Sequence, residues 1–190
     1  GPLMSGPYDT LLDEAANRLY VAQAGSNVVS VIDLSTGLAI AQVPVGAQPR
    51  SLLFSRDGRT VYVHDAFDNT LSMIETRFFS TTDALPVSSS SPDFALVLGA
   101  RLFHSADDPR MSTGAVSCAS CHEGGLSDGR AWDGRITPPL RDLPSDALAG
   151  WGGLNDHIRQ MQGGLGFRDG SDDAIDRDAL IRYMLHLAGP

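Results

Sequence analysis

The only two cysteines of the chain lie three positions apart and are followed at once by a histidine, in the run Ser117-Cys118-Ala119-Ser120-Cys121-His122. A Cys-x-x-Cys-His sequence is the attachment signature of c-type haem. The two thiols add across the haem vinyl groups, and the adjacent imidazole ligates the iron. The spacing lets both sulfurs reach one porphyrin from a single helical turn. We therefore expect one covalent haem c, held by Cys118 and Cys121, with His122 as the proximal iron ligand.

Two other kinds of site use closely spaced cysteines. A structural zinc site needs two further Cys or His ligands in a similar arrangement, and no second pair of cysteines exists. A thioredoxin-like dithiol follows a strand of a βαβ unit, which the surrounding sequence does not resemble. Haem attachment fits the residues better than either alternative.

The composition limits the function classes. The chain has 190 residues, of which 42% are hydrophobic, and no run of 18 apolar residues, so we expect no membrane span. The net charge is −9, and the acids are in excess in both halves, so we expect no nucleic-acid partner. Gly1-Pro2-Leu3 before Met4 looks like the remnant of a cleaved tag, and no signal peptide is visible. Because haem is attached covalently outside the cytoplasmic membrane, we expect a bacterial periplasmic, extracellular or cell-surface location.

The first half of the chain alternates apolar and polar residues and repeats itself. Leu19-Tyr20-Val21 and Val61-Tyr62-Val63 match at a shift of 42 positions without a gap. The same shift relates further polar and apolar positions, namely Asn27 to Asn69, Ser30 to Ser72, Ile32 to Ile74 and Asp33 to Glu75. We expect strands near residues 10–12, 18–23, 28–33, 38–44, 50–55, 60–65 and 70–75. A period near forty with four strands per unit is typical of a propeller blade.

Residues 19–22, 27–33 and 49–58 resemble the YVTN-type β-propeller repeat. The resemblance covers about residues 8–77 and implies two blades, the second incomplete. Propellers close with four or more blades. We therefore expect either the rest of a truncated propeller or a homo-oligomer to complete the structure, and we favour the first.

The second half reads as helices around the haem motif. We expect a linker over residues 78–91, then a helix capped by Ser91, with Pro92 in its first turn and an apolar stripe of Phe94, Val97, Leu98 and Leu102. A short helix is expected over residues 155–162. A last helix carries the stripe Leu180, Tyr183, Met184 and Leu187. Glycine is unfavourable inside a helix, so a glycine there indicates that a side chain would obstruct a close contact. We therefore expect the two long helices to cross where Gly99 meets Tyr183.

This order resembles a class I cytochrome c domain. More narrowly, residues 98–103 with the haem motif, and the later run Arg135-Ile136-Thr137-Pro138-Pro139-Leu140-Arg141, resemble the haem domains of the di-haem peroxidase superfamily. The expected fold is thus a mixed, two-part chain. Residues 1–7 are expected to be a tag remnant and leader, and residues 8–77 antiparallel β-blade repeats that form a partial propeller. Residues 78–91 are expected to be a linker, and residues 92–190 an all-α monohaem cytochrome c domain.

Further residues are candidates for contacts to the haem. Arg130, Trp132 and Arg135 lie in the polar loop where haem propionates commonly find donors, although an arginine there is otherwise a solvated charge. By resemblance, the carbonyl of Pro138 or Pro139 accepts a hydrogen bond from His122; otherwise these prolines stiffen a loop.

Methionine and histidine side chains are the candidates for the distal iron ligand. Met161 precedes the last helix, as a ligating methionine would, and His157 lies one helical turn before it. We favour Met161, with His157 next and His104 as a further candidate. Core packing is expected for Met184, an apolar loop position for Met111, and a surface position for His64 and His186.

One haem motif rather than two favours a one-electron carrier that serves a redox protein partner. A peroxidase-like haem enzyme is the alternative, and a protein-binding propeller module is a third. No catalytic residue is assigned.

Overall fold

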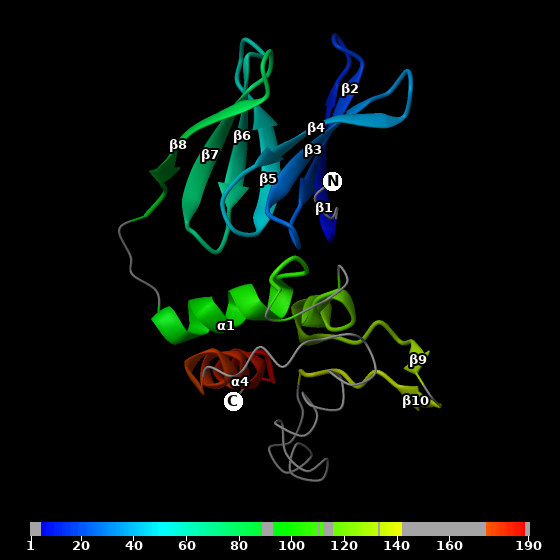
Figure 1. Ribbon diagram of the computed structural model, residues 1–190, viewed down its shortest axis with the longest axis vertical. Coiled ribbons are helices and arrows are strands. Elements are labelled where there is room, and N and C mark those ends of the chain that lie inside the picture. The colour runs from blue at the N-terminus through cyan, green and yellow to red at the C-terminus, as the bar shows by residue number, and fades with distance from the viewer. Residues whose placement is uncertain are drawn as a thin grey trace. The chain divides into compact units, whose positions relative to one another are not determined.

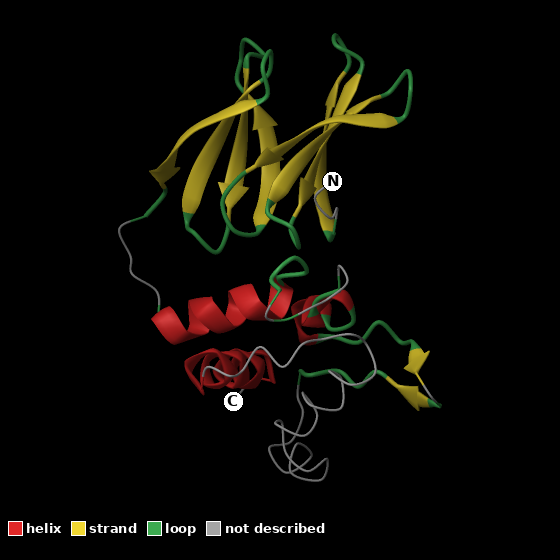
Figure 2. Ribbon diagram, viewed as in Figure 1, coloured by secondary structure: helices red, strands yellow, loops and turns green. Residues whose placement is uncertain are grey.

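The computed structural model describes residues 5–88, 93–109, 111, 116–132, 134–141 and 174–188. The chain divides into two compact units, Gly1–Ser90 and Ser91–Pro190. Among the described residues, the N-terminal unit contains strands and no helix, and the helices lie in the C-terminal unit (Figures 1 and 2).

The N-terminal unit consists of two four-stranded antiparallel sheets, each with its strands side by side in sequence order. We name these sheets blade 1 and blade 2. Blade 1 contains β1 (Pro7–Asp13), β2 (Arg18–Gln23), β3 (Val28–Asp33) and β4 (Leu38–Pro44). Blade 2 contains β5 (Pro49–Phe54), β6 (Thr60–Asp65), β7 (Thr70–Glu75) and β8 (Ser80–Pro86). The seven expected strands are all present, and the unit has the architecture of a partial β-propeller.

The 42-residue repeat extends from side chains to backbone hydrogen bonds. The Ala24 amide donates to the Gly6 carbonyl at 2.8 Å, and 42 positions later the Ala66 amide donates to the Gln48 carbonyl at 3.0 Å. The turn residues Asn27 and Asn69 have φ values of 55° and 54°. Asparagine tolerates this left-handed conformation better than most side chains, which explains why it occupies both turns.

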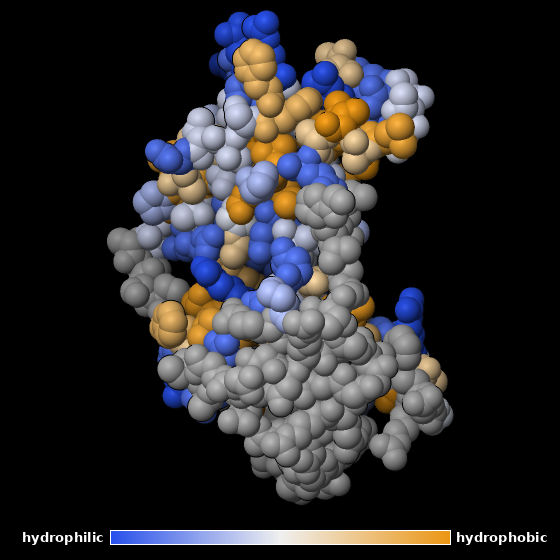
Figure 3. All heavy atoms as spheres, viewed as in Figure 1, coloured by the Kyte–Doolittle hydropathy of each residue, from blue (hydrophilic) through white to orange (hydrophobic). Residues whose placement is uncertain are grey.

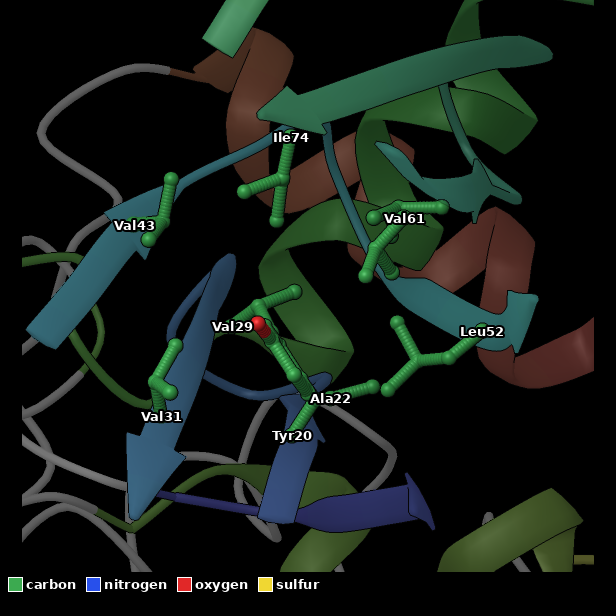
Figure 4. Packing of buried hydrophobic residues seen from close by; sticks show 9 residues of the cluster. Tyr20, Ala22, Val29, Val31, Val43, Leu52, Val61 and Ile74 are labelled. Carbon is green, nitrogen blue, oxygen red and sulfur yellow. The ribbon is translucent and has the colours of Figure 1, made fainter. Parts of the chain in front are cut away.

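The two blades pack face to face over one hydrophobic core. Side chains of β2, β3 and β4 meet side chains of β5, β6 and β7, and most of them are fully buried: Tyr20, Ala22, Val29, Val31, Val43, Leu52, Val61, Val63 and Ile74 (Figure 4). The Tyr20 and Phe54 rings meet edge to face, with centroids 5.6 Å apart. Alternate residues along each strand supply this core, as the period of two requires.

Two expected boundaries in the N-terminal unit are wrong. The expected linker over residues 78–91 contains β8, which pairs with β7 and makes the second blade complete. All seven residues of β8 are exposed, so this edge strand has no buried face and no apolar alternation to reveal it. The expected leader over residues 1–7 includes Pro7, the first residue of β1.

The described part of the C-terminal unit contains two α-helices, α1 (Phe94–His104) and α4 (Ala174–Ala188), and two 3-10 turns, η1 (Cys118–Ser120) and η2 (Glu123–Gly125). It also contains a short hairpin of β9 (Ala131–Trp132) and β10 (Arg135–Ile136), which the expected all-α domain lacks. The helix expected over residues 155–162 lies outside the described residues. A complete all-α cytochrome c domain therefore stays a prediction.

Helix α1 begins later than expected. Its N-cap is Asp93, whose carboxylate accepts hydrogen bonds from the amides of Ala95 at 2.9 Å and Leu96 at 3.3 Å. Ser91, the expected cap, lies outside the described residues. Phe94 was expected in the apolar stripe but is 74% exposed, because it is the first residue of the helix and precedes the buried residues, which begin at Gly99.

The two long helices cross at Gly99, as the sequence predicts. A Cβ atom on Gly99 would lie 2.7 Å from the Ala179 carbonyl carbon and 2.7 Å from the Tyr183 Cβ atom, and closer still to the Ala179 carbonyl oxygen. Only glycine permits this approach, which explains a residue that costs about 1 kcal/mol of helix propensity relative to alanine. The crossing brings together the core of this unit: Leu102, Phe103, Met111, Cys118, Ala119, Leu140, Leu180 and Met184.

Candidate haem-attachment site

The motif residues form one helical turn. The Cys118 carbonyl accepts hydrogen bonds from the Cys121 amide at 3.2 Å and from the His122 amide at 3.0 Å. Residues three and four positions apart in such a turn share one face. The turn is closed at its start by the Ser117 amide, which donates to the Ser120 hydroxyl at 3.0 Å. This local geometry brings both cysteines and the histidine onto one turn of the backbone.

The His122 imidazole is buried and held by the backbone. It is 2% exposed, and its Nδ1 atom lies 3.2 Å from the Leu126 carbonyl oxygen. Burial lowers the pKa of His122, while hydrogen bonds to the backbones of Leu126 and Pro138 and the charge of the nearby Asp128 carboxylate act in the opposite direction. The net shift is downward, so the ring is neutral at pH 7. A neutral imidazole whose Nδ1 is fixed by a carbonyl is the form of histidine that ligates metals.

The two thiols are free and protonated. Cys118 is 8% exposed, and burial raises its pKa to about 12. Cys121 is half-buried, and its pKa is raised by burial and by the nearby Asp128 carboxylate. Reactive dithiols have lowered pKa values, so this environment does not favour a redox dithiol. Among the residues that the structure describes, no three His, Cys, Asp or Glu side chains are grouped as a metal site.

The loop after the motif folds back on it through backbone hydrogen bonds. The Gly125 carbonyl accepts from the amides of Leu140 and Arg141, both at 2.8 Å, and the Arg141 Nε atom donates to the Gly124 carbonyl at 2.7 Å. Gly125 has a φ of 78°, and a Cβ atom there would lie 3.1 Å from the Arg141 Cγ atom. The loop is thus fixed against the haem-motif turn, which brings Pro138 to His122.

The structure describes some of the residues that are expected to contact the haem. Arg130 is exposed and forms a 3.9 Å ion pair with Asp128. The backbones of Trp132 and Arg135 pair with each other across the β9–β10 hairpin, and their side chains lie outside the described part of the structure. The backbone of Pro138 is a hydrogen-bond partner of His122, and Pro139 is exposed. The sequence analysis missed Leu126, because a loop carbonyl four positions after the histidine leaves no trace in residue type.

The methionine and histidine candidates for the distal ligand lie in different surroundings. Met184 and Met111 are buried in the helical core, 6% and 7% exposed, in keeping with packing roles. His104 is buried, and its Nε2 atom lies 3.2 Å from the Tyr183 hydroxyl, so its ring is engaged at the helix crossing. Met161 and His157, the two favoured distal ligands, lie outside the described residues.

The remaining described histidines are His64 and His186. His186 is exposed on α4, as expected for a surface residue. His64 was expected at the surface and is half-buried on β6.

Comparison with protein families finds no match, and comparison with curated proteins finds none either. Among solved structures, the chain is similar to hydrazine synthase of Kuenenia stuttgartiensis, with 20% identity over 45% of this chain and 24% of that chain and a TM-score of 0.43. It is also similar to AztD of Citrobacter koseri, with 18% identity over 45% and 25% and a TM-score of 0.40. A third similar structure is the dihydro-haem d1 dehydrogenase NirN in complex with DHE, with 24% identity over 45% and 18% and a TM-score of 0.39.

These three structures are β-propeller-like proteins, and the chain spans a quarter or less of their lengths. At this level of similarity they assign no function to the chain. Among the described residues, no helix is both long enough and apolar enough to cross a membrane.

Proposed function

We propose that this chain is a c-type cytochrome that carries single electrons. One haem is attached through thioethers to Cys118 and Cys121, and His122 is the proximal ligand of its iron. The blades form a module for docking or assembly, and the electron partner is another redox protein. The proposal includes an exported location, because covalent haem attachment takes place outside the cytoplasmic membrane.

The observation that carries this proposal is the state of His122. Its ring is buried, neutral and fixed through Nδ1 by the Leu126 carbonyl, on the same turn as two protonated thiols. A histidine that only fills a core does not require two free cysteines on the same backbone turn. This donor set, one imidazole with two thiols at i, i+3 and i+4, is the set that covalent haem attachment requires.

The residues of the chain would then set the environment of the haem. Bound there, haem would supply an iron that changes its charge by one electron. The Leu126 and Pro138 backbones hold His122 in one orientation and increase the basicity of the ring. Leu102, Phe103 and Leu140, buried in the same cluster as Cys118, exclude water from this side. Arg130, Trp132 and Arg135 are proposed to bind the propionates, and Met161 is proposed as the distal ligand.

Optical and electron paramagnetic resonance spectra of the haem-loaded protein test this function. A carrier has a six-coordinate, low-spin iron in both redox states. A high-spin ferric form would instead indicate an open coordination position and a peroxidase-like enzyme. His122→Ala should change the spectra, whereas the matched variant His186→Ala, at an exposed histidine of α4, should leave them unchanged. Spectra that are insensitive to His122→Ala would contradict its role as iron ligand.

A further inference from the structure

Two turns at one end of blade 2 bring exposed arginines together. The turn between β5 and β6 carries Arg56 and Arg59, and the turn between β7 and β8 carries Arg77. The turns are bonded to each other, because the Thr76 amide donates to the Arg59 carbonyl at 3.0 Å and the Thr76 hydroxyl donates to the Gly58 carbonyl at 3.1 Å. In the space-filling view, strongly hydrophilic side chains gather at this end of blade 2 (Figure 3).

An exposed aromatic side chain belongs to the same surface. Phe78 follows Arg77 in its turn and is 71% exposed. The centroid of its ring lies 5.0 Å from the guanidinium carbon of Arg77. A guanidinium at this distance from an aromatic face is attracted to it, which keeps the two groups together. We call Arg56, Arg59, Arg77 and Phe78 the arginine patch.

The arginines of the patch are weakly paired with acids of this chain. Arg59 lies 3.9 Å from the Asp57 carboxylate, and the two side chains are 84% and 63% exposed. Such an exposed ion pair is weak, so the guanidinium stays available to another carboxylate. No described acidic side chain forms an ion pair with Arg56 or Arg77.

The fold of the β7–β8 turn requires neither the guanidinium of Arg77 nor the ring of Phe78. The β3–β4 turn of blade 1 has the same hydrogen bonds 42 positions earlier. In each turn, the carboxylate of the first residue accepts from the amides two and three positions later, and its carbonyl accepts from the amide four positions later. Ser35 and Thr36 stand there in place of Arg77 and Phe78. The larger side chains therefore serve something other than the turn.

The positive charge is a property of blade 2 and not of the repeat. Residues 55–60 and 75–80 carry three arginines and two acids, a net charge of +1. The equivalent residues 13–18 and 33–38 of blade 1 carry one arginine and three acids, a net charge of −2. The whole chain has a net charge of −9. A local positive surface on an acidic chain orients an acidic partner as it approaches.

We propose that the arginine patch docks a partner protein that presents carboxylates around an apolar side chain. A guanidinium matches a carboxylate with two parallel hydrogen bonds. Arginine and large aromatic residues are enriched among the side chains that dominate binding between proteins. Phe78 supplies the apolar contact, which a polyphosphate does not use, and the net charge of −9 opposes a long polyphosphate.

Further blades do not cover this surface. Blades 1 and 2 pack through their sheet faces, whereas the patch lies in turns at the ends of strands. The inference rests on the docking role proposed for the blades and adds the chemistry of the partner. It does not need haem, since all four side chains belong to the N-terminal unit. Its failure would therefore leave the test of haem attachment unaffected.

Nitrogen–proton NMR spectra of the full chain, recorded as an acidic peptide is added, test the proposal. The probe is the synthetic peptide Glu-Glu-Leu-Glu-Glu with blocked ends. The amide signals of residues 55–60 and 75–80 should shift and saturate. Raising the ionic strength to about 1 M, where the Debye length is about 3 Å, should weaken binding several-fold. Tripolyphosphate, of similar charge but without an apolar group, should bind these turns more weakly.

The variant Arg77→Ser with Phe78→Thr carries the residues that the same turn has in blade 1, so it keeps the hydrogen bonds of the turn. It should raise the dissociation constant of the peptide by about 10-fold. Arg56→Glu, which places the blade 1 residue on the other turn, should also weaken binding. Arg182→Ser is the matched control, because it removes the same charge from an exposed ion pair on α4 and should bind as the wild type does.

Three results would overturn the proposal. The amides of both turns could keep their positions at every peptide concentration, which would mean that the patch binds no acidic segment. Binding that is unchanged in Arg77→Ser with Phe78→Thr and in Arg56→Glu would place the site elsewhere. Tripolyphosphate that binds the turns more tightly than the peptide would assign the patch to phosphate anions instead of a protein.

Discussion

Replacing Gly99 by alanine tests the helix crossing of the C-terminal unit. The added methyl carbon would lie 2.7 Å from the Ala179 carbonyl carbon and from the Tyr183 Cβ atom, whereas carbon atoms pack best at about 3.5–4.0 Å. The obstructing atoms belong to the backbone and to a Cβ atom, so no side-chain rotation relieves the overlap. Helix α4 must therefore move away by roughly 1 Å, which loosens the contacts of Leu102 and Met184.

The expected change in the free energy of unfolding follows from two opposed effects. Overpacking a tight contact costs about 1–3 kcal/mol, and here the upper half of that range applies because backbone atoms are involved. Alanine returns about 1 kcal/mol of helix propensity. The expected net loss is about 1–2 kcal/mol, which for a unit of this size lowers the melting temperature by roughly 5–10 °C.

Circular dichroism at a helix-sensitive wavelength during thermal unfolding measures this loss, with wild type and variant compared in the same state of haem loading. Ala95→Gly, in the first turn of the same helix at a half-buried position, is the control for propensity alone and should cost at most about 1 kcal/mol. If Gly99→Ala instead raises the melting temperature by the amount that propensity provides, the close approach of the helices at Gly99 is wrong.

Three further predictions concern single side chains. Burial raises the pKa of Asp65 in the folded state. The protonated carboxyl therefore stabilises the blades below the unfolded pKa of about 4, and this stabilisation is lost as pH rises through the higher folded pKa. In wild type the urea midpoint should fall with pH across that interval, and Asp65→Asn should remove this part of the pH dependence. Tyr183→Phe deletes the hydroxyl that lies 3.2 Å from the His104 Nε2 atom and should cost about 1 kcal/mol in the same thermal assay; no change would mean that this contact contributes nothing. Met161→Ala should abolish the weak methionine-to-ferric charge-transfer band and lower the reduction potential; an untouched spectrum, with a high-spin iron in His157→Ala, would make the haem bis-histidine.

The blades are the part of the fold that sequence predicts best. Strict alternation over the core strands and an ungapped shift of 42 residues fix both the strands and their pairing, because each repeated pair such as Tyr20 and Tyr62 occupies an equivalent place in its sheet. Strand β8 escapes prediction because its stability comes from backbone pairing with β7 and not from a buried face. Apolar patterns in a sequence reflect which residues are buried, and an exposed edge strand has no buried residues to produce such a pattern.

The haem-motif turn is predicted in type but not in its surroundings. The spacing of Cys118, Cys121 and His122 is local, so it specifies the turn directly. The partner of His122 is a backbone carbonyl, that of Leu126, and backbone atoms are the same in every residue. The exposed position of Phe94 likewise follows from where α1 begins, which depends on whether Asp93 or Ser91 caps it, and both residue types are good caps.

The most direct test of the proposed function is the intact mass of the denatured protein after production in a host that exports it and matures c-type cytochromes. We predict that the wild-type chain retains the mass of one haem after denaturation, and that Cys118→Ser with Cys121→Ser loses it. An unmodified wild-type chain with two free thiols, obtained from cells that attach haem to a control cytochrome, would contradict the central claim.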